Sequence, residues 1–306
     1  MLFSYAKNLT ACVFHSRERI QMPNNNQNIY TNSNKAVRAT FGTNQARAAL
    51  YYKDFVDFVK WNAENNQLAS DVTLLDVGCG NGWSTHCLAT SGFHSVGVDL
   101  NPNAFEAPVS QNFSLQFASA TALPFPDSHF DIITCYQCLE HVPNPELALH
   151  EMRRVCKPSG LILIVGPNLL NPLLGLSYLV KPKNWKSIKY IRTPSMPIHP
   201  CGNTPTEIVY LSAVRFLQTM QKLTAWWPIF SMRKPDTNPP FHADNDACYL
   251  CSPIDLIRYF TKYGFNVIRK AKQGRLSLFY FLRGGTWVAV KKPPKPDHFP
   301  NLIAPS

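Results

Sequence analysis

Lysine and arginine are missing from residues 61–150 of this 306-residue chain, although the whole sequence carries a net charge of +11. The same stretch holds nine aspartates and glutamates, so the excess positive charge comes from the flanks. There the basic residues alternate with proline and apolar residues and form no groove-length run. We therefore do not expect a nucleic-acid partner. Charged residues are only 16% and hydrophobic residues 45%, which excludes a disordered chain.

Glycine is also scarce, at 14 residues against 25 prolines, which predicts substantial irregular structure. The nine cysteines are an odd number without the spacing of a small disulfide framework, so we expect free thiols in a reducing, cytoplasmic location. A secretory leader is not expected, because Lys7 interrupts the short apolar start. A transit peptide stays open as an alternative, since Arg17 and Arg19 add positive charge.

No charged residue occurs in residues 161–180, a length that would span a membrane. Two segments, Gly166-Pro167-Asn168 and Asn171-Pro172, would break a helix in lipid, so we expect no span. Residues 169–180 remain apolar and lead into a Lys-, Trp- and Tyr-rich segment that ends at residue 192. This composition suits peripheral contact with a membrane surface through residues 169–192. The alternative, which we favour, is a cap with solvated lysines.

Strands and helices are expected to alternate through most of the chain. Expected strands are residues 73–77, 94–99, 113–117, 130–136, 161–165, 266–269 and 286–290, and expected helices are 44–65, 83–91, 144–156 and 252–263. This rhythm predicts an α/β fold, Rossmann-like, with a twisted, mainly parallel seven-stranded sheet and helices on both faces.

The expected domain boundaries follow from where strands and helices alternate. Residues 44–166 and 252–292 form the α/β domain, and residues 167–251 form a cap inserted after the fifth strand. Residues 1–43 are a partly disordered N-terminal tail, and residues 293–306 are a C-terminal tail. Because the cap follows a strand at the ligand-binding edge of such a sheet, it should shape specificity.

The most informative segment is Leu74-Leu75-Asp76-Val77-Gly78-Cys79-Gly80-Asn81-Gly82. It places a glycine-rich turn directly after a buried strand, where the backbone must turn tightly and let a ligand approach. Asp99 ends the next strand, where a carboxylate can accept both hydroxyls of a ribose. A nicotinamide site would need a third glycine where Trp83 stands.

The acid-x-G-x-G-x-G pattern resembles motif I of the class I S-adenosylmethionine-dependent methyltransferases. Four further segments look like the ubiquinone and menaquinone biosynthesis enzymes of that family: Ala122–Asp127, Phe130–Cys135, Leu139–Pro143 and Arg154–Gly160. The resemblance covers about residues 70–167 and, more faintly, 252–291. It implies S-adenosyl-L-methionine as the cofactor.

At the first strand, the resemblance implies that the backbone of Gly78, Cys79 and Gly80 lines the methionine and ribose part of the cofactor. Asp76 would orient the methionine amino end, directly or through water. The Cys79 thiol is expected to be part of the turn and not a nucleophile.

At the second and fourth strands, the resemblance implies that Asp99 binds the ribose hydroxyls and that Leu100 and Asn101 flank the adenine. Gln137 would face the methionine end.

After the third strand, Ser119, Ala120 and Thr121 should sit at the adenine edge. Many relatives carry an acid where this chain has Ser119, and that acid accepts from the adenine amino group. A serine has a shorter reach, so cofactor affinity is expected to be reduced.

Methyl transfer from a sulfonium needs a general base only when the acceptor must lose a proton. His141, in the loop after the fourth strand, is the candidate base; a histidine that only supports the fold is an equal alternative. Glu140 could orient His141 or, as we favour, cap the next helix. Four other residues could line an acceptor pocket: His199, Tyr210, His242 and Tyr249.

Two C-x-x-C pairs, Cys135/Cys138 and Cys248/Cys251, resemble zinc ligands only in spacing. The first begins inside an expected strand and neither has a knuckle composition, so we expect ordinary thiols and no metal.

Together these features predict in-line methyl transfer to a small-molecule, lipid-like or glycan acceptor. An anionic acceptor, such as a lipid- or phosphate-linked sugar, would suit the basic residues of the cap. Two alternatives stay open: a catalytically silent binding module and an RNA methyltransferase.

Overall fold

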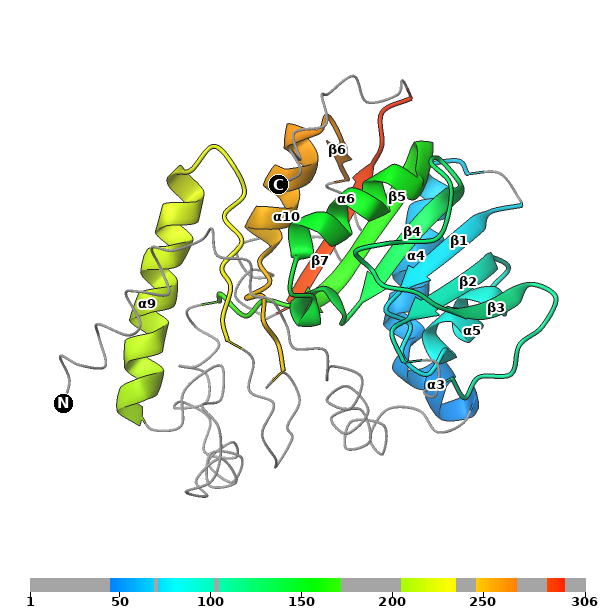
Figure 1. Ribbon diagram of the computed structural model, residues 1–306, viewed down its shortest axis with the longest axis horizontal. Helices are drawn as coiled ribbons and strands as arrows, with labels where there is room; N and C mark the ends of the chain where they lie inside the picture. Colours follow the sequence, from blue (N-terminus) through cyan, green and yellow to red (C-terminus); the bar gives the residue numbers. More distant parts are fainter. Residues whose placement is uncertain are drawn as a thin grey trace.

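The computed structural model describes residues 45–68, 71–101, 105–171, 205–234, 246–268 and 285–294. Seven strands form one sheet in the order β3-β2-β1-β4-β5-β7-β6, with β7 antiparallel to both of its neighbours (Figure 1). The strands are β1 (Thr73–Val77), β2 (His94–Asp99), β3 (Phe113–Phe117), β4 (Phe130–Tyr136), β5 (Cys156–Pro167), β6 (Asn266–Val267) and β7 (Gly285–Lys291). The expected Rossmann-like, mainly parallel seven-stranded α/β fold is confirmed.

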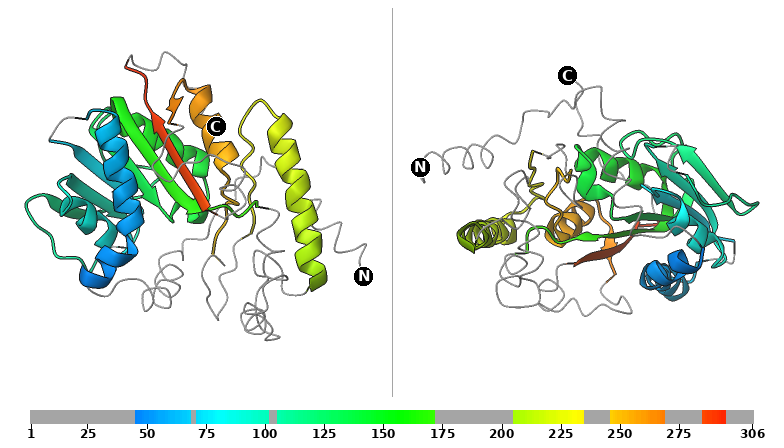
Figure 2. Two further views of the ribbon diagram at one scale, coloured as in Figure 1. Left: turned by 180° about the vertical axis from the view of Figure 1, so that it is seen from behind. Right: turned by 90° about the horizontal axis from the view of Figure 1, so that it is seen from below.

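Helices cover both faces of this sheet (Figure 2). One face carries α3 (Gln45–Tyr51), α4 (Lys53–Asn65) and α5 (Trp83–Ala89), and the other carries α6 (Pro145–Val155) and α10 (Pro253–Lys262). A short 3-10 turn, η2 (Leu139–His141), follows β4, and α9 (Pro205–Thr224) stands outside the sheet beyond α10.

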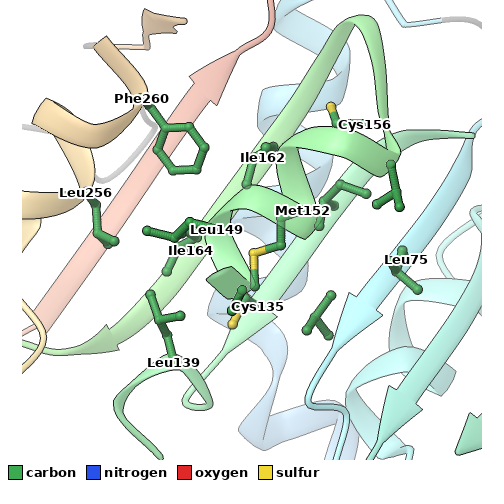
Figure 3. Packing of buried hydrophobic residues seen from close by; sticks show 14 of the residues in the cluster. Leu75, Cys135, Leu139, Leu149, Met152, Cys156, Ile162, Ile164, Leu256 and Phe260 are labelled. Atoms are coloured by element: carbon green, nitrogen blue, oxygen red, sulfur yellow. The ribbon is translucent and has the colours of Figure 1, made fainter. Parts of the chain in front are cut away.

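The apolar runs of the central strands supply both cores, because successive side chains point to opposite faces. Leu75 and Ile162 pack with α6 and α10, whereas their neighbours Leu74 and Leu161 pack with α4 and α5. Figure 3 shows the first core, where Met152 of α6 lies over the central strands and Phe260 of α10 lies beside β7, near Ile162 of β5. A sheet buried on both faces leaves its strand ends as the place for a site.

Most sequence-based bounds hold to within two residues, and three differences are larger. β5 extends beyond the expected 161–165 at both ends. The expected helix 44–65 is divided at Tyr52, whose ψ of 2° departs from helical values while its ring packs edge-on against Tyr136. The third difference is α9, which lies in the cap where no periodicity was recognised.

The reason that α9 escaped recognition is its inverted polarity. Its inner face, toward the protein, is mostly polar, and its buried residues are Ile208, Ser212, Arg215, Thr219 and Lys222. Its exposed side is apolar, and we call the following residues the outer face of α9: Val209, Tyr210, Phe216, Leu217, Met220 and Leu223. Trp226 and Trp227 follow directly and are 91% and 62% exposed. A pattern search expects the apolar stripe to face the core.

A buried ion pair fixes α9 to the domain. The Lys222 ammonium lies 2.5 Å from Oδ2 of Asp255 in α10, and both side chains are almost fully buried. Asp255 also accepts from the hydroxyl of Tyr249 at 3.1 Å and from the amide of Ile229 at 3.3 Å. Burial lowers the pKa of Lys222 and raises that of Asp255, and their mutual attraction opposes both shifts. The pair therefore holds the cap helix at a cost in desolvation.

We expect Lys222→Met to lower the free energy of unfolding by about 3–5 kcal/mol, because it leaves the Asp255 carboxylate buried without its cation. Urea denaturation followed by tryptophan fluorescence measures the change. The double variant Lys222→Met/Asp255→Asn should recover part of the loss, since the neutral amide removes the unpaired charge. Wild-type stability of Lys222→Met would show that this pair does not anchor α9.

Candidate functional site

The site is built on the carboxyl ends of β1, β2 and β4, which lie side by side in the sheet. Val77, the last residue of β1, pairs with Val98 of β2 and with Cys135 of β4. The glycine turn follows Val77, and its first amide, that of Gly78, donates to the carbonyl of Val98 at 2.8 Å. The predicted residues after these three strands therefore meet at one edge of the sheet.

Asp76 anchors the glycine turn from below. Its carboxylate is 1% exposed and accepts from three hydroxyls: Ser84 at 2.6 Å, Thr85 at 2.8 Å and Thr134 at 2.8 Å. Burial raises the pKa of Asp76, and the three hydrogen bonds oppose that shift. These contacts tie β1 to β4 and α5, so the structure supports a positioning role for Asp76.

Two glycines of the turn have left-handed φ for different reasons. A Cβ on Gly78 (φ +75°) would come within 2.1 Å of Cys138 Sγ, so that position is closed by the loop after β4. A Cβ on Gly80 (φ +57°) would meet no atom within 4 Å. The backbone at Gly80 therefore borders open space, as a ligand-binding turn requires. Between them, Cys79 is buried, and burial keeps its thiol pKa well above the ordinary value, so it is no nucleophile.

Asp99 ends β2 beside this open space. Its Oδ2 accepts from the amide of Gly80 at 2.8 Å and its Oδ1 from the amide of Asn101 at 3.0 Å. Leu100 is exposed, whereas Asn101 is buried, and no described residue pairs with its side-chain Nδ2. The structure thus brings together three predicted binding residues, one carboxylate, one apolar surface and one buried donor.

The loop after β3 forms a tight local turn. The Ser119 hydroxyl lies 2.8 Å from that of Thr121 and accepts from the Thr121 amide at 3.2 Å. Ala120 packs against the core on the α6 face. The Ser119 hydroxyl is therefore engaged within its own turn, which is consistent with a weaker polar contact there than an acid would give.

Arg154 of α6, which sequence reasoning did not single out, fixes the segment after that turn. Its guanidinium donates to the carbonyls of Leu123 and Phe125 at 2.9 and 2.7 Å and to Asp127 at 2.9 Å. Glu151 pairs with the same guanidinium at 2.8 Å and accepts from the Leu123 amide at 2.9 Å. The sequence shows this arginine at the start of the Arg154–Gly160 segment, but its contacts become visible only in the fold.

Gln137 follows β4 with a left-handed φ of +50°, which is uncommon for a residue with a side chain. Its amide donates to the carbonyl of Val165 at 2.7 Å, and its side chain is exposed. This backbone conformation turns the chain so that Cys138 reaches Gly78. Strain of this kind concentrates at functional sites.

His141 stands next along the same loop, in η2, and is close to two carboxylates. Its Nδ1 lies 3.1 Å from Asp246 Oδ1, and its Nε2 lies 3.9 Å from Glu140 Oε1. The imidazole is 24% exposed. Asp246, which sequence reasoning missed, comes from the predicted cap and carried no motif that would have marked it. The expected capping role of Glu140 is wrong, since Asn144 caps α6 by accepting from the Leu147 amide at 3.0 Å.

Other sequence-based candidates separate from this site. Tyr249 is fully buried and bonded to Asp255, so the suggested place in an acceptor pocket is wrong. Tyr210 lies on the outer face of α9. His199 and His242 lie outside the described residues. Within the described part of the chain, no three His, Cys, Asp or Glu side chains gather as metal ligands.

Comparisons with known proteins agree with this geometry. A family model described as a methyltransferase domain matches residues 75–164. The chain is 31% identical to a ubiquinone biosynthesis O-methyltransferase of Azoarcus sp. (strain BH72), over 47% of this chain and 67% of the relative. This chain belongs to the class I S-adenosylmethionine-dependent methyltransferases. Its cofactor is S-adenosyl-L-methionine.

Two further comparisons mark the range of likeness. An uncharacterized methyltransferase of Mycolicibacterium gilvum (strain PYR-GCK) is 35% identical, over 39% of this chain and 49% of that protein. The solved structure of the [4+2]-cyclase SpnF has a TM-score of 0.48 and 16% identity, over 87% of this chain and 94% of SpnF. The chain thus spans about half to two thirds of the length of the two curated relatives.

The residues at the strand ends fit the cofactor of this methyltransferase. Open space at Gly80 leaves room for a backbone-bound ligand, and the Asp99 carboxylate suits ribose hydroxyls. The buried Nδ2 of Asn101 has no hydrogen-bond partner among the described residues, as expected for a donor that a ligand would satisfy.

Gly80→Ala and Gly78→Ala should separate ligand contact from folding. Gly80→Ala should cost only about 1–2 kcal/mol of stability, from left-handed strain, but weaken S-adenosylhomocysteine binding at least tenfold, because its methyl group enters the open space. Gly78→Ala adds a clash with Cys138 to the same strain, so its stability loss should be larger. Calorimetric titration and urea denaturation measure the two effects. Wild-type affinity in Gly80→Ala would place the cofactor elsewhere.

Proposed function

We propose that this methyltransferase transfers the methyl group of S-adenosylmethionine, in line, to a hydroxyl of a small, lipid-like acceptor. The observation that carries the proposal is His141, whose loop follows β4 and packs against the glycine turn through Cys138. Cys138 touches Gly78, and His141 follows three residues later, its amide bonded to the Cys138 carbonyl at 2.9 Å. A base so placed is needed only if the acceptor loses a proton.

The protein's part in this reaction is positioning and proton transfer. When bound, the cofactor supplies an electrophilic methyl group on a sulfonium. Asp99, Asn101 and the Gly78–Gly80 backbone would hold it, and Asp76 would keep the turn in place. His141 would take the proton of the acceptor hydroxyl, whose oxygen would bond to the methyl carbon while the electron pair of the S–C bond stayed on sulfur.

A hydroxyl acceptor is favoured over an amine for two reasons. An oxygen nucleophile must lose its proton during or before transfer, which gives a basic imidazole a use. The Azoarcus relative is named as an O-methyltransferase in ubiquinone biosynthesis, which favours a phenolic hydroxyl on an isoprenoid-bearing ring.

The outer face of α9 supports a lipid-like acceptor taken from a membrane surface. None of the exposed residues of α9 is charged, and the two exposed tryptophans at its end suit the interface between lipid and water. Residues 181–192 contain five basic residues and no acidic ones, which complements anionic headgroups. Their structure lies outside the described residues, as does that of residues 172–192 of the predicted contact 169–192. In the described part of the chain, no helix is long and apolar enough to cross a membrane.

Methyl transfer is tested with a catechol that bears a short isoprenoid tail. The wild-type protein should form S-adenosylhomocysteine with it, and His141→Asn should lower kcat by about 10²–10⁴-fold with unchanged cofactor affinity. Mass spectrometry of the methylated catechol and calorimetry give the two readouts. Cofactor binding without product across phenols, amines and glycans would favour a silent module, and methylation of RNA alone would favour the RNA alternative.

Vesicle co-sedimentation tests the membrane contact. The wild-type protein should bind vesicles of phosphatidylglycerol and phosphatidylcholine and release them at high salt, and Leu217→Ser/Trp227→Ser should reduce binding at least tenfold. Val109→Ser, an exposed apolar change in the loop before β3, is the matched control and should bind normally. Equal vesicle binding by the wild-type protein, the double variant and the control would contradict a lipid-facing α9. So would a wild-type dimer that the double substitution dissociates, because the outer face would then be a contact between two copies of the chain.

A further inference from the structure

Asp246 and His141 are brought together by a segment that lies outside the matched methyltransferase domain. Residues 246–251 pack against η2, where the Glu140 carbonyl accepts from the amides of Cys248 at 2.9 Å and Tyr249 at 3.0 Å. Tyr249 is itself locked by its bond to Asp255. The backbone two and three residues beyond Asp246 is thus fixed to the turn that carries His141. The carboxylate reaches the imidazole from a built position.

Two carboxylates lie at different distances from the two nitrogens of this imidazole. Asp246 faces Nδ1 at 3.1 Å, within hydrogen-bonding distance, whereas Glu140 faces Nε2 at 3.9 Å, beyond it. Arg233, whose amide bonds to the Cys248 carbonyl at 2.8 Å, adds positive charge near Asp246, and the Cys248 thiol stays neutral because burial raises its pKa to about 12. An acceptor on Nδ1 favours the tautomer with its proton there.

The ionisation of the Asp246 carboxyl agrees with its pairing to His141. Burial alone would raise its pKa, but the contact with His141, a backbone hydrogen bond and the positive charge of Arg233 together outweigh burial and hold the pKa below the ordinary value. The carboxylate is therefore ionised at neutral pH, and only an ionised carboxylate both orients an imidazole and stabilises the imidazolium.

We propose that Asp246 is the positioning residue for His141, binding Nδ1–H so that Nε2 takes the acceptor proton. The inference rests on the proposed function for the reaction that it serves. During transfer the acceptor proton moves to Nε2, the imidazolium is stabilised by Asp246, and the proton then leaves to water. The methyl carbon forms its bond to the acceptor oxygen while the sulfur keeps the electrons of the broken S–C bond. Asp246 touches neither cofactor nor acceptor in this assignment.

The test compares Asp246→Asn with a matched histidine–carboxylate pair elsewhere in the same chain. Asp71 lies 2.7 Å from His94 at the opposite end of β1 and β2, and both side chains are exposed, so Asp71→Asn is the control. NMR titration of the imidazole should give a lower pKa for His141 in Asp246→Asn and no change in Asp71→Asn. With the tailed catechol, kcat should fall tenfold or more in Asp246→Asn, and the acid limb of the pH profile should move to lower pH. Asp246→Glu should retain part of the activity.

Each outcome bears on one assignment. An unchanged His141 pKa, or wild-type kcat in Asp246→Asn, overturns the role of Asp246 even if methyl transfer is established. Loss of cofactor affinity in Asp246→Asn would also overturn it, because a positioning residue for the base leaves that affinity intact. If the pKa of His141 does shift in Asp246→Asn but the wild-type protein methylates no acceptor, the proposed function is overturned instead. The His141–Asp246 pair is then structural.

Discussion

The buried carboxylate of Asp76 is the interaction on which the site depends. Hydroxyls from α5 and β4 converge on it, so one side chain sets the position of β1 relative to its neighbours at the edge where the chain turns. Burying a charge is costly, and the raised pKa of Asp76 records that cost. Three hydrogen-bond donors compensate in part. What the arrangement gains is a fixed backbone from Gly78 onward, which a loop with only apolar packing would not supply.

The cap is fastened by the same means, with a buried polar network in place of an apolar stripe. Lys222, Asp255 and Tyr249 join α9, α10 and the segment that carries Asp246. The inner face of α9 therefore needs polar residues, and its apolar residues are released to the outside. The polar residues on the inner face of α9 thus both anchor the cap and leave the apolar residues of the helix exposed. The network also holds Tyr249, whose amide bonds to the Glu140 carbonyl next to His141.

The sheet could be predicted from the sequence because its signals are local. Runs such as Leu161–Val165, buried on both faces, and caps such as Ser252 at α10 depend on a few adjacent residues. The candidate cofactor residues could be proposed because the glycine turn follows β1 and Asp99 ends β2, the next strand along the chain. By contrast, Asp246 reaches His141, and Arg154 reaches the carbonyls of Leu123 and Phe125, across long stretches of chain, and no local pattern marks these partners. α9 was missed because its apolar stripe faces solvent, whereas helices are recognised in a sequence by an apolar stripe that faces the core.

Several places where local rules fail lie in the candidate site. Gln137 has a side chain in a left-handed conformation, Gly80 borders unfilled space, and Asn101 buries a donor that pairs with no described residue. Each would lower stability in a protein selected only to fold. All three lie just after the carboxyl ends of β1, β2 and β4, which are mostly buried. The rigid sheet can hold these departures because its two cores are large and continuous, so the site can remain open without loosening the fold around it.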